Sequence, residues 1–146
     1  MGLRVWLSRG LIAVVVLWNL QCAAMFLIQP DQYAPAYELE GAPGTAAVQG
    51  MGILFVMWNI PYLVALSDPA RRRISLLEAL AMQTVGVIGE SLLLAGLPEG
   101  HTLLRASIQR FILFDGIGVA LLVLAAAAVV PVWREQRSGQ NLVQPV

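Results

Sequence analysis

The sequence has few of the residues on which metal and redox sites depend. It contains one cysteine, Cys22, and one histidine, His101, among 146 residues. A single cysteine excludes an internal disulfide and the paired-thiol chemistry of quinone-linked membrane oxidoreductases. A single histidine argues against bis-histidine haem and histidine-rich metal sites. We therefore predict neither a metal ion nor a cofactor for this chain.

Charged residues are also scarce, and lysine is absent. They make up 12% of the chain, against ~25% in a typical soluble domain, whereas 58% of the residues are hydrophobic. The net charge is zero, and the nine basic residues are all arginines that form no cluster interleaved with aromatic residues. Nucleic acid is therefore not an expected partner. The composition instead predicts a single integral membrane domain, with the lipid bilayer around it.

Four apolar runs are long enough to span a membrane, because crossing a ~30 Å hydrocarbon core takes roughly 20 helical residues. They cover residues 11–28, 46–66, 76–97 and 103–130. Proline and glycine, which end helices, are concentrated in the connections, including an outer loop at 30–45. The short connections place successive helices antiparallel. The sequence therefore predicts an all-α fold, a four-transmembrane-helix antiparallel bundle with up-down-up-down topology, followed by a tail at 134–146.

The arginines are distributed unevenly between the two ends of this bundle. The first and third connections together hold only Arg105. Seven lie at the N-terminus, in the second connection and at the C-terminus: Arg4, Arg9, Arg71, Arg72, Arg73, Arg134 and Arg137. Because cytoplasmic segments carry the excess of basic residues, we predict a multi-pass protein of the inner (cytoplasmic) membrane with both termini in the cytoplasm.

The N-terminal segment has a second interpretation. Arg4 and Arg9, followed by the apolar residues 11–20, match the first two regions of a cleaved signal peptide. The apolar run continues to residue 28, however, which is long enough to span. We therefore expect this segment to be the first transmembrane helix.

Polar and ionisable residues interrupt every apolar run. At a rise of ~1.5 Å per residue, Glu90 in the third run and Arg110 in the fourth both lie ~10 Å below the outer surface. These two runs are joined by a short turn, so their helices are neighbours. Because arginine cannot lose its charge by deprotonation, we predict a Glu90–Arg110 ion pair.

A second polar layer lies nearer the cytoplasmic side. One residue from each run falls ~10–12 Å from that side: Asn19, Asn59, Gln83 and Asp115. Gly86 shares a helix face with Gln83, and Gly118 shares one with Asp115, which allows close helix approach. Two interpretations stay open. The layer is either packing glue, at ~0.6–2 kcal/mol per hydrogen bond, or a site for a small ligand or protons, with Asp115 as its leading residue.

The outer loop also has two interpretations. It is acidic and rich in small residues. Such a segment is either an ordinary interfacial connection or a lid that folds over the mouth of the bundle.

The layout resembles the DoxX-like group of small four-helix membrane proteins. The matching features are a first helix ending at Pro30, an acidic outer loop with proline and glycine, the glycine-bearing segment 46–52, the arginine-rich second turn, and the step Gly89-Glu90-Ser91. Glu90 stands where this group is expected to carry a basic residue. The resemblance implies a bacterial membrane bundle. Some members are associated with quinone-linked sulfur oxidation, which implies a hydrophobic or quinone-like ligand.

Three functions compete on these observations. Small size and minimal loops favour a non-enzymatic subunit or assembly partner of a membrane complex, or a homo-oligomer. The alternative is a binding or transport module for a small or lipid-like ligand or for protons, built on the polar layer. A membrane enzyme with Glu90 or Asp115 as general acid or base is the weakest of the three, because no nucleophile–base pair or phosphate loop accompanies them. We therefore assign no catalytic residue.

Overall fold

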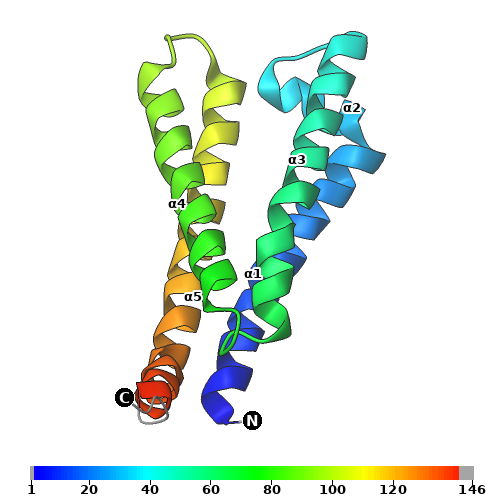
Figure 1. Cartoon of the computed structure of the whole chain (residues 1–146). Helices are drawn as coiled ribbons and strands as arrows, with labels where there is room; N and C mark the ends of the chain where they lie inside the picture. The colour runs from blue at the N-terminus through cyan, green and yellow to red at the C-terminus, as the bar shows by residue number, and fades with distance from the viewer. Residues whose placement is uncertain (1, 142–146) are drawn as a thin grey trace.

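The computed structural model describes residues 2–141 and consists of helices joined by short connections. In chain order these are α1 (Leu3–Ile28), α2 (Pro30–Tyr33), the 3-10 helix η1 (Ala34–Tyr37), α3 (Gly41–Ser67), α4 (Arg73–Gly96) and α5 (Thr102–Asn141). The four long helices run alternately up and down, and both ends of the chain lie at the same end of the bundle (Figure 1). The predicted all-α antiparallel bundle is confirmed.

All four long helices are long and apolar enough to cross a membrane. The candidate spans are Leu3–Ile28, Gly41–Ser67, Arg73–Gly96 and Thr102–Gln136. They extend beyond the predicted apolar runs at most of their ends, because a helix does not stop where its side chains become polar. α1 begins at Leu3 rather than at residue 11, and α5 continues through the predicted tail as far as Asn141. Residues 142–146 of that tail lie outside the described residues.

Each long helix packs against two others, so that the four form a closed ring in the order α1, α3, α4, α5. We call the end with both chain termini the terminal end and the opposite end the loop end. The α1–α3 pair and the α4–α5 pair separate toward the loop end (Figure 1). The larger apolar core lies in the terminal half and includes Ile12, Val15, Leu76, Leu122 and Val129. A smaller, aromatic cluster around Phe26 lies in the loop-end half.

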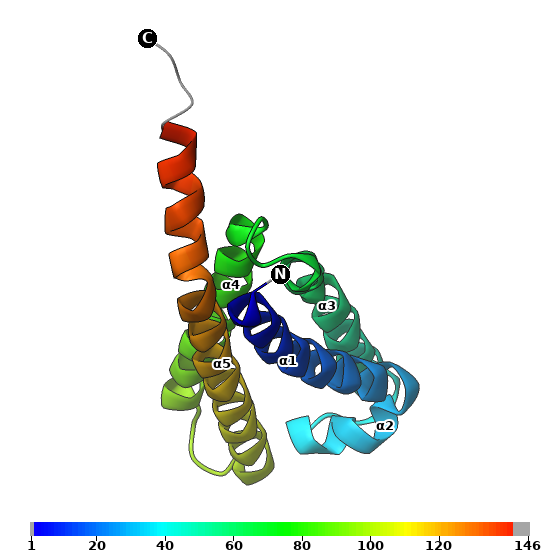
Figure 2. The ribbon, with the colours of Figure 1, turned by 90° about the horizontal axis from the view of Figure 1, so that it is seen from below.

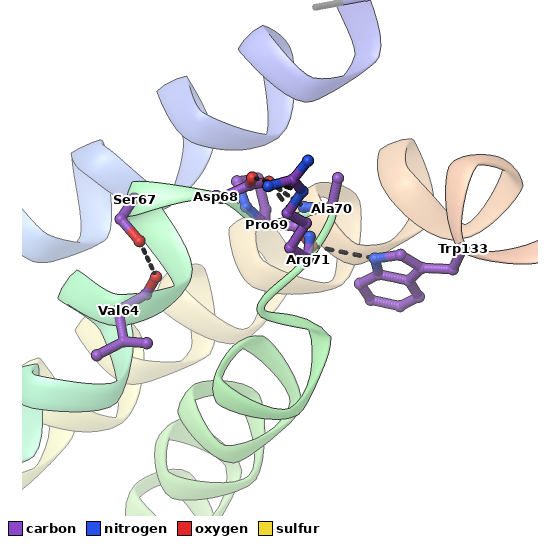
Figure 3. A network of polar contacts seen from close by, with 7 residues as sticks. All are labelled: Val64, Ser67, Asp68, Pro69, Ala70, Arg71 and Trp133. Atoms are coloured by element: carbon purple, nitrogen blue, oxygen red, sulfur yellow. Dashed lines mark hydrogen bonds and ion pairs between the residues drawn. The ribbon is translucent and has the colours of Figure 1, made fainter. Parts of the chain in front are cut away.

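The turn between α3 and α4 is fixed to α5 at the terminal end (Figure 3). Asp68 Oδ1 accepts hydrogen bonds from the backbone N–H groups of Ala70 and Arg71, at 3.1 and 3.2 Å. The indole N–H of Trp133 donates to the carbonyl oxygen of Pro69 at 3.0 Å. Beyond this contact, the last turns of α5 extend away from the other helices (Figure 2). The terminal end is therefore held by hydrogen bonds between side chains and backbone as well as by apolar packing.

The outer loop is ordered and is bonded to the start of α5. The Glu38 carboxylate accepts a hydrogen bond from the backbone N–H of Leu104 at 3.3 Å and lies 2.5 Å from Nδ1 of His101. Ser107 Oγ donates to the carbonyl oxygen of Ala36 at 2.6 Å. Glu38 itself has a φ of 58°, in the left-handed region that L residues avoid. These contacts offset that local strain and hold η1 against α5.

Candidate intramembrane binding site

The structure brings part of the predicted polar layer into direct contact. The Gln83 amide donates from Nε2 to Oδ1 of Asp115 at 2.7 Å. The Tyr62 hydroxyl donates to Oε1 of Gln83 at 2.6 Å. We call these three residues the polar chain. It connects α3, α4 and α5, and its members are only 2–7% exposed. A buried polar group without a hydrogen-bond partner is costly, so these two hydrogen bonds lower the cost of burying the three side chains.

Tyr62 is the member that the sequence analysis missed. It follows Asn59 by three residues, so both lie on the same face of α3. A tyrosine in the interior of a membrane helix needs a partner for its hydroxyl group. Tyr62 can therefore be recognised in the sequence by its three-residue spacing from Asn59, which is already assigned to the polar layer.

Two glycines make room for the hydrogen bond between Gln83 and Asp115. A Cβ atom added at Gly86 would collide with Oδ2 of Asp115. A Cβ atom added at Gly118 would lie 2.6 Å from Nε2 of Gln83. Each glycine lies three residues after the polar residue of its own helix, and α4 and α5 are antiparallel. Each polar side chain therefore packs over the glycine of the opposite helix, which confirms the predicted close approach.

Asn19 and Asn59 are buried, but they do not join the polar chain directly. The Asn59 amide donates to the carbonyl oxygen of Phe55 at 2.7 Å within α3. The Oδ1 atoms of both asparagines are buried without a hydrogen-bond partner. Asn19, Tyr62, Gln83 and Asp115 line a small cavity. The volume available to the centre of a water molecule in it is about 10 Å³. This is the room of about one water molecule.

Glu90 and Arg110 do not form the predicted ion pair. The guanidinium group of Arg110 donates to Ser107 Oγ at 3.1 Å, and within residues 2–141 it has no carboxylate partner. Oε2 of Glu90 is buried without a hydrogen-bond partner. The distance of a residue along its helix predicts its depth in the membrane. It does not reveal that side chains of η1 lie between the helices. Tyr37 of η1 reaches into this space beside Phe111.

Two larger cavities occupy the loop-end half of the bundle. The α3–α4 cavity has a volume of about 400 Å³ and is lined by Tyr37, Met51, Leu54, Phe55, Trp58, Glu90, Leu93, Leu97, Leu104, Ile108 and Phe111. The α1–α5 cavity has a volume of about 370 Å³ and is lined by Cys22, Phe26, Gln32, Tyr33, Ala36, Tyr37, Ser107, Arg110, Phe111 and Phe114. Both volumes fall within the ~300–1,000 Å³ of small-molecule sites. Tyr37 and Phe111 belong to both linings.

The wall between the cavities is aromatic. The ring of Phe111 stacks on Phe55 with centroids 6.1 Å apart and lies 6.3 Å from Tyr37. Phe26 contacts Tyr33 with centroids 5.1 Å apart. Burial raises the pKa of the Tyr37 phenol above its ordinary value. Within the described residues, no group of three or more acidic, histidine or cysteine side chains is placed to hold a metal ion.

Comparison with protein-family models, with curated proteins and with solved structures finds no match. What stands from the predicted DoxX-like resemblance is the layout of four long apolar helices, which the structure itself supplies.

Proposed function

We propose that this chain binds one amphipathic, lipid-like molecule in the loop-end half of its transmembrane bundle. The observation that supports this role is the pair of cavities of about 400 and 370 Å³ that meet at Tyr37 and Phe111. Their linings are apolar and aromatic, with Glu90 as the charged residue of one and Arg110 of the other. A largely apolar lining with a few polar groups is typical of sites for hydrophobic ligands.

The surroundings favour a ligand that comes from the bilayer. Helix α4 has large apolar side chains that are exposed on the surface of the bundle, among them Val85, Ile88, Leu92 and Leu93. Such a surface faces acyl chains, and a molecule that already lies in the bilayer reaches the cavities between the helices without crossing water. With the termini in the cytoplasm, as the arginines predict, the cavities belong to the outer half of the membrane.

The polar chain lies directly below the α3–α4 cavity. Phe55 and Trp58 line both that cavity and the water-sized cavity beside Asp115. A ligand that displaces either ring therefore acts on the hydrogen bonds of Gln83 and Asp115. This adjacency supports a binding role for the layer in addition to its packing role.

Tryptophan quenching by a brominated amphiphile tests the proposal. Trp58 lines the α3–α4 cavity, whereas Trp133 lies at the terminal end on Pro69. Two proteins that keep only Trp58 or only Trp133, with the other tryptophans replaced by phenylalanine, are purified in neutral detergent and titrated with dibromostearyl alcohol, a neutral amphiphile that avoids repulsion by Glu90. We expect saturable quenching of Trp58 at about one molecule per chain, and only gradual, non-saturating quenching of Trp133. Parallel, non-saturating quenching of both would contradict the proposal.

A matched pair of substitutions on α5 identifies the cavity as the site. Ile108→Phe places a larger side chain in the α3–α4 cavity, whereas Leu113→Phe adds the same ring to a surface position that is 66% exposed. We expect Ile108→Phe to weaken the saturable quenching of Trp58 and Leu113→Phe to leave it unchanged. Equal effects of the two substitutions would place the bound molecule outside the cavity.

The subunit role predicted from the sequence remains a separate prediction. The exposed apolar faces of the helices suit contact with lipid and contact with another membrane subunit equally well. Extraction in mild detergent tests it, because a subunit role requires that defined partner chains co-purify. A monomer that carries a bound amphiphile would favour the binding role.

A further inference from the structure

Arg110 is a permanent positive charge in the membrane that the protein leaves largely unpaired. The guanidinium group has five N–H donors, and only one hydrogen bond to a protein acceptor, Ser107 Oγ, is made within residues 2–141. Ser107 is itself committed, because its hydroxyl donates to the carbonyl oxygen of Ala36. Arginine stays charged at any physiological pH. Arg110 is exposed rather than buried, so its remaining donors are open to an acceptor from outside the chain.

The cavity beside Arg110 changes from polar to aromatic with depth. Gln32, Ser107 and Arg110 line it toward the loop end, together with the hydroxyl-bearing rings of Tyr33 and Tyr37. α1 runs toward the loop end and α5 away from it, so Cys22 and Phe114 line its deeper part. A polar mouth above an aromatic floor matches a molecule with one polar head and one apolar chain.

The sign of the head group follows from the charges on the two sides of the aromatic wall. The α1–α5 cavity contains Arg110, whereas the carboxylate in the α3–α4 cavity is that of Glu90. An anion placed beside Arg110 gains charge-assisted hydrogen bonds, and guanidinium groups pair with carboxylate and phosphate in a two-pronged geometry. In the neighbouring cavity the same anion would face Glu90.

We propose that the α1–α5 cavity binds an anionic amphiphile, with its carboxylate or phosphate on the Arg110 guanidinium group and its acyl chain against Phe26 and Phe114. The inference rests on the proposed function and adds the class of ligand and the residue that selects it. Arg105 provides an internal comparison on the same helix. Its guanidinium group donates to the carbonyl oxygen of Leu97 at 3.1 Å, and it lines neither of the two cavities.

The test uses Trp18, whose ring contacts that of Phe114 in a tilted arrangement with centroids 5.4 Å apart. A protein that keeps only Trp18 is titrated in neutral detergent with dibromostearic acid and, separately, with dibromostearyl alcohol. We expect the acid to bind about tenfold or more tightly than the alcohol, as a hydrogen bond to a charged group predicts. Arg110→Gln removes this preference, Arg110→Lys keeps part of it, and Arg105→Gln leaves it intact. Circular dichroism spectra check that each variant keeps its helices.

The outcomes separate this inference from the proposed function. Equal binding of acid and alcohol to the original protein, or an equal loss of preference in Arg105→Gln, overturns the inference but leaves saturable quenching of Trp58 in place. Absence of saturable quenching at both Trp18 and Trp58 overturns the proposed function as well. A third arm adds inorganic phosphate in excess. If phosphate displaces the acid completely, the site takes free anions and the acyl chain plays no part, which also overturns the inference.

Discussion

Glu90 and Arg110 line different cavities, and the side chains of Tyr37 and Phe111 are common to both. These two ionisable side chains are thus separated by aromatic rings instead of forming an ion pair. In a membrane interior, an ionisable group without a partner is costly. The separation is therefore the feature that most clearly distinguishes this bundle from one built for packing alone.

The glycines opposite the polar chain should be intolerant of alanine. Gly86→Ala and Gly118→Ala force Cβ atoms onto the Asp115 carboxylate and the Gln83 amide, and overpacking of this kind costs ~1–3 kcal/mol. Gly89→Ala and Gly116→Ala are matched controls on the same two helices, because a Cβ atom there meets nothing within 4 Å. Reversible unfolding in mixed detergent micelles measures the free energies. Equal effects at all four positions would refute the close packing described here.

The Tyr62 hydroxyl should contribute measurably to the stability of the bundle. Tyr62→Phe leaves Oε1 of Gln83 without its donor, and hydrogen bonds between membrane helices contribute ~0.6–2 kcal/mol. Tyr33→Phe is the control, because no hydrogen bond of the Tyr33 hydroxyl is present in the described part of the chain. The same unfolding assay compares the two variants. A loss no larger than that of Tyr33→Phe would show that the polar chain does not stabilise the fold.

Asp115→Asn should separate folding from function at the polar layer. The substituted side chain keeps an oxygen that accepts the hydrogen bond from Gln83, so we expect the helical circular dichroism spectrum to be retained. The amide of the Asp115→Asn variant cannot bind or release a proton as the carboxyl group does. Infrared difference spectra between acid and alkaline pH should then lose one carboxyl band relative to the original protein. If the variant fails to fold, the carboxyl group has a structural role and the layer is packing glue.

The attachment of the outer loop to α5 should weaken in acid. The hydrogen bond between His101 and Glu38 holds the pKa of that carboxyl below its ordinary value. A carboxyl group with a lowered pKa contributes stability above its usual titration range, and this contribution is lost as the pH falls through the lowered pKa. Hydrogen exchange at the Leu104 amide should therefore show protection at neutral pH that decreases in acid. Glu38→Gln should make the protection independent of pH.

Glu40→Gln is the control for that experiment, since Glu40 lies on the same loop and its side chain makes no hydrogen bond within the described residues. The control should retain the pH-dependent protection of Leu104. If Glu38→Gln and Glu40→Gln behave alike, the contact between Glu38 and the start of α5 does not hold the loop.

The contact between Trp133 and the α3–α4 turn should stabilise the terminal end. Trp133→Phe removes the N–H donor to Pro69 while it keeps most of the apolar ring, and we expect a loss of ~0.5–1.5 kcal/mol. Trp6→Phe is the control, because Trp6 is 57% exposed. Thermal unfolding monitored by circular dichroism compares the two. Equal melting temperatures would show that the indole hydrogen bond does not contribute.

The depth of each polar residue could be predicted from the sequence, because helical rise and membrane thickness are fixed quantities. All four residues of the predicted layer, Asn19, Asn59, Gln83 and Asp115, are buried in the structure. Depth does not give the direction of a side chain around its helix axis. For that reason the contact between Gln83 and Asp115 was not singled out in advance, and Asn59 bonds within its own helix instead.

The two cavities could not be predicted, because they depend on residues outside the apolar runs. The segment 34–37 reads as part of a proline-rich loop, yet it folds as η1 and is held to α5 by Glu38 and Ser107. This places Tyr37 between the helix pairs. The predicted ion pair fails to form for the same reason, since the rings of Tyr37 and Phe111 lie between the cavities of Glu90 and Arg110.

A structure of the protein in bilayer nanodiscs, determined without exchange of the co-purified lipids, tests the central claim most directly. We expect elongated density in the loop-end half, with one end at the Arg110 guanidinium group and its length along Phe26 and Phe114. Cavities that are closed by rearranged side chains, or filled only by ordered water, would contradict a binding role for this bundle.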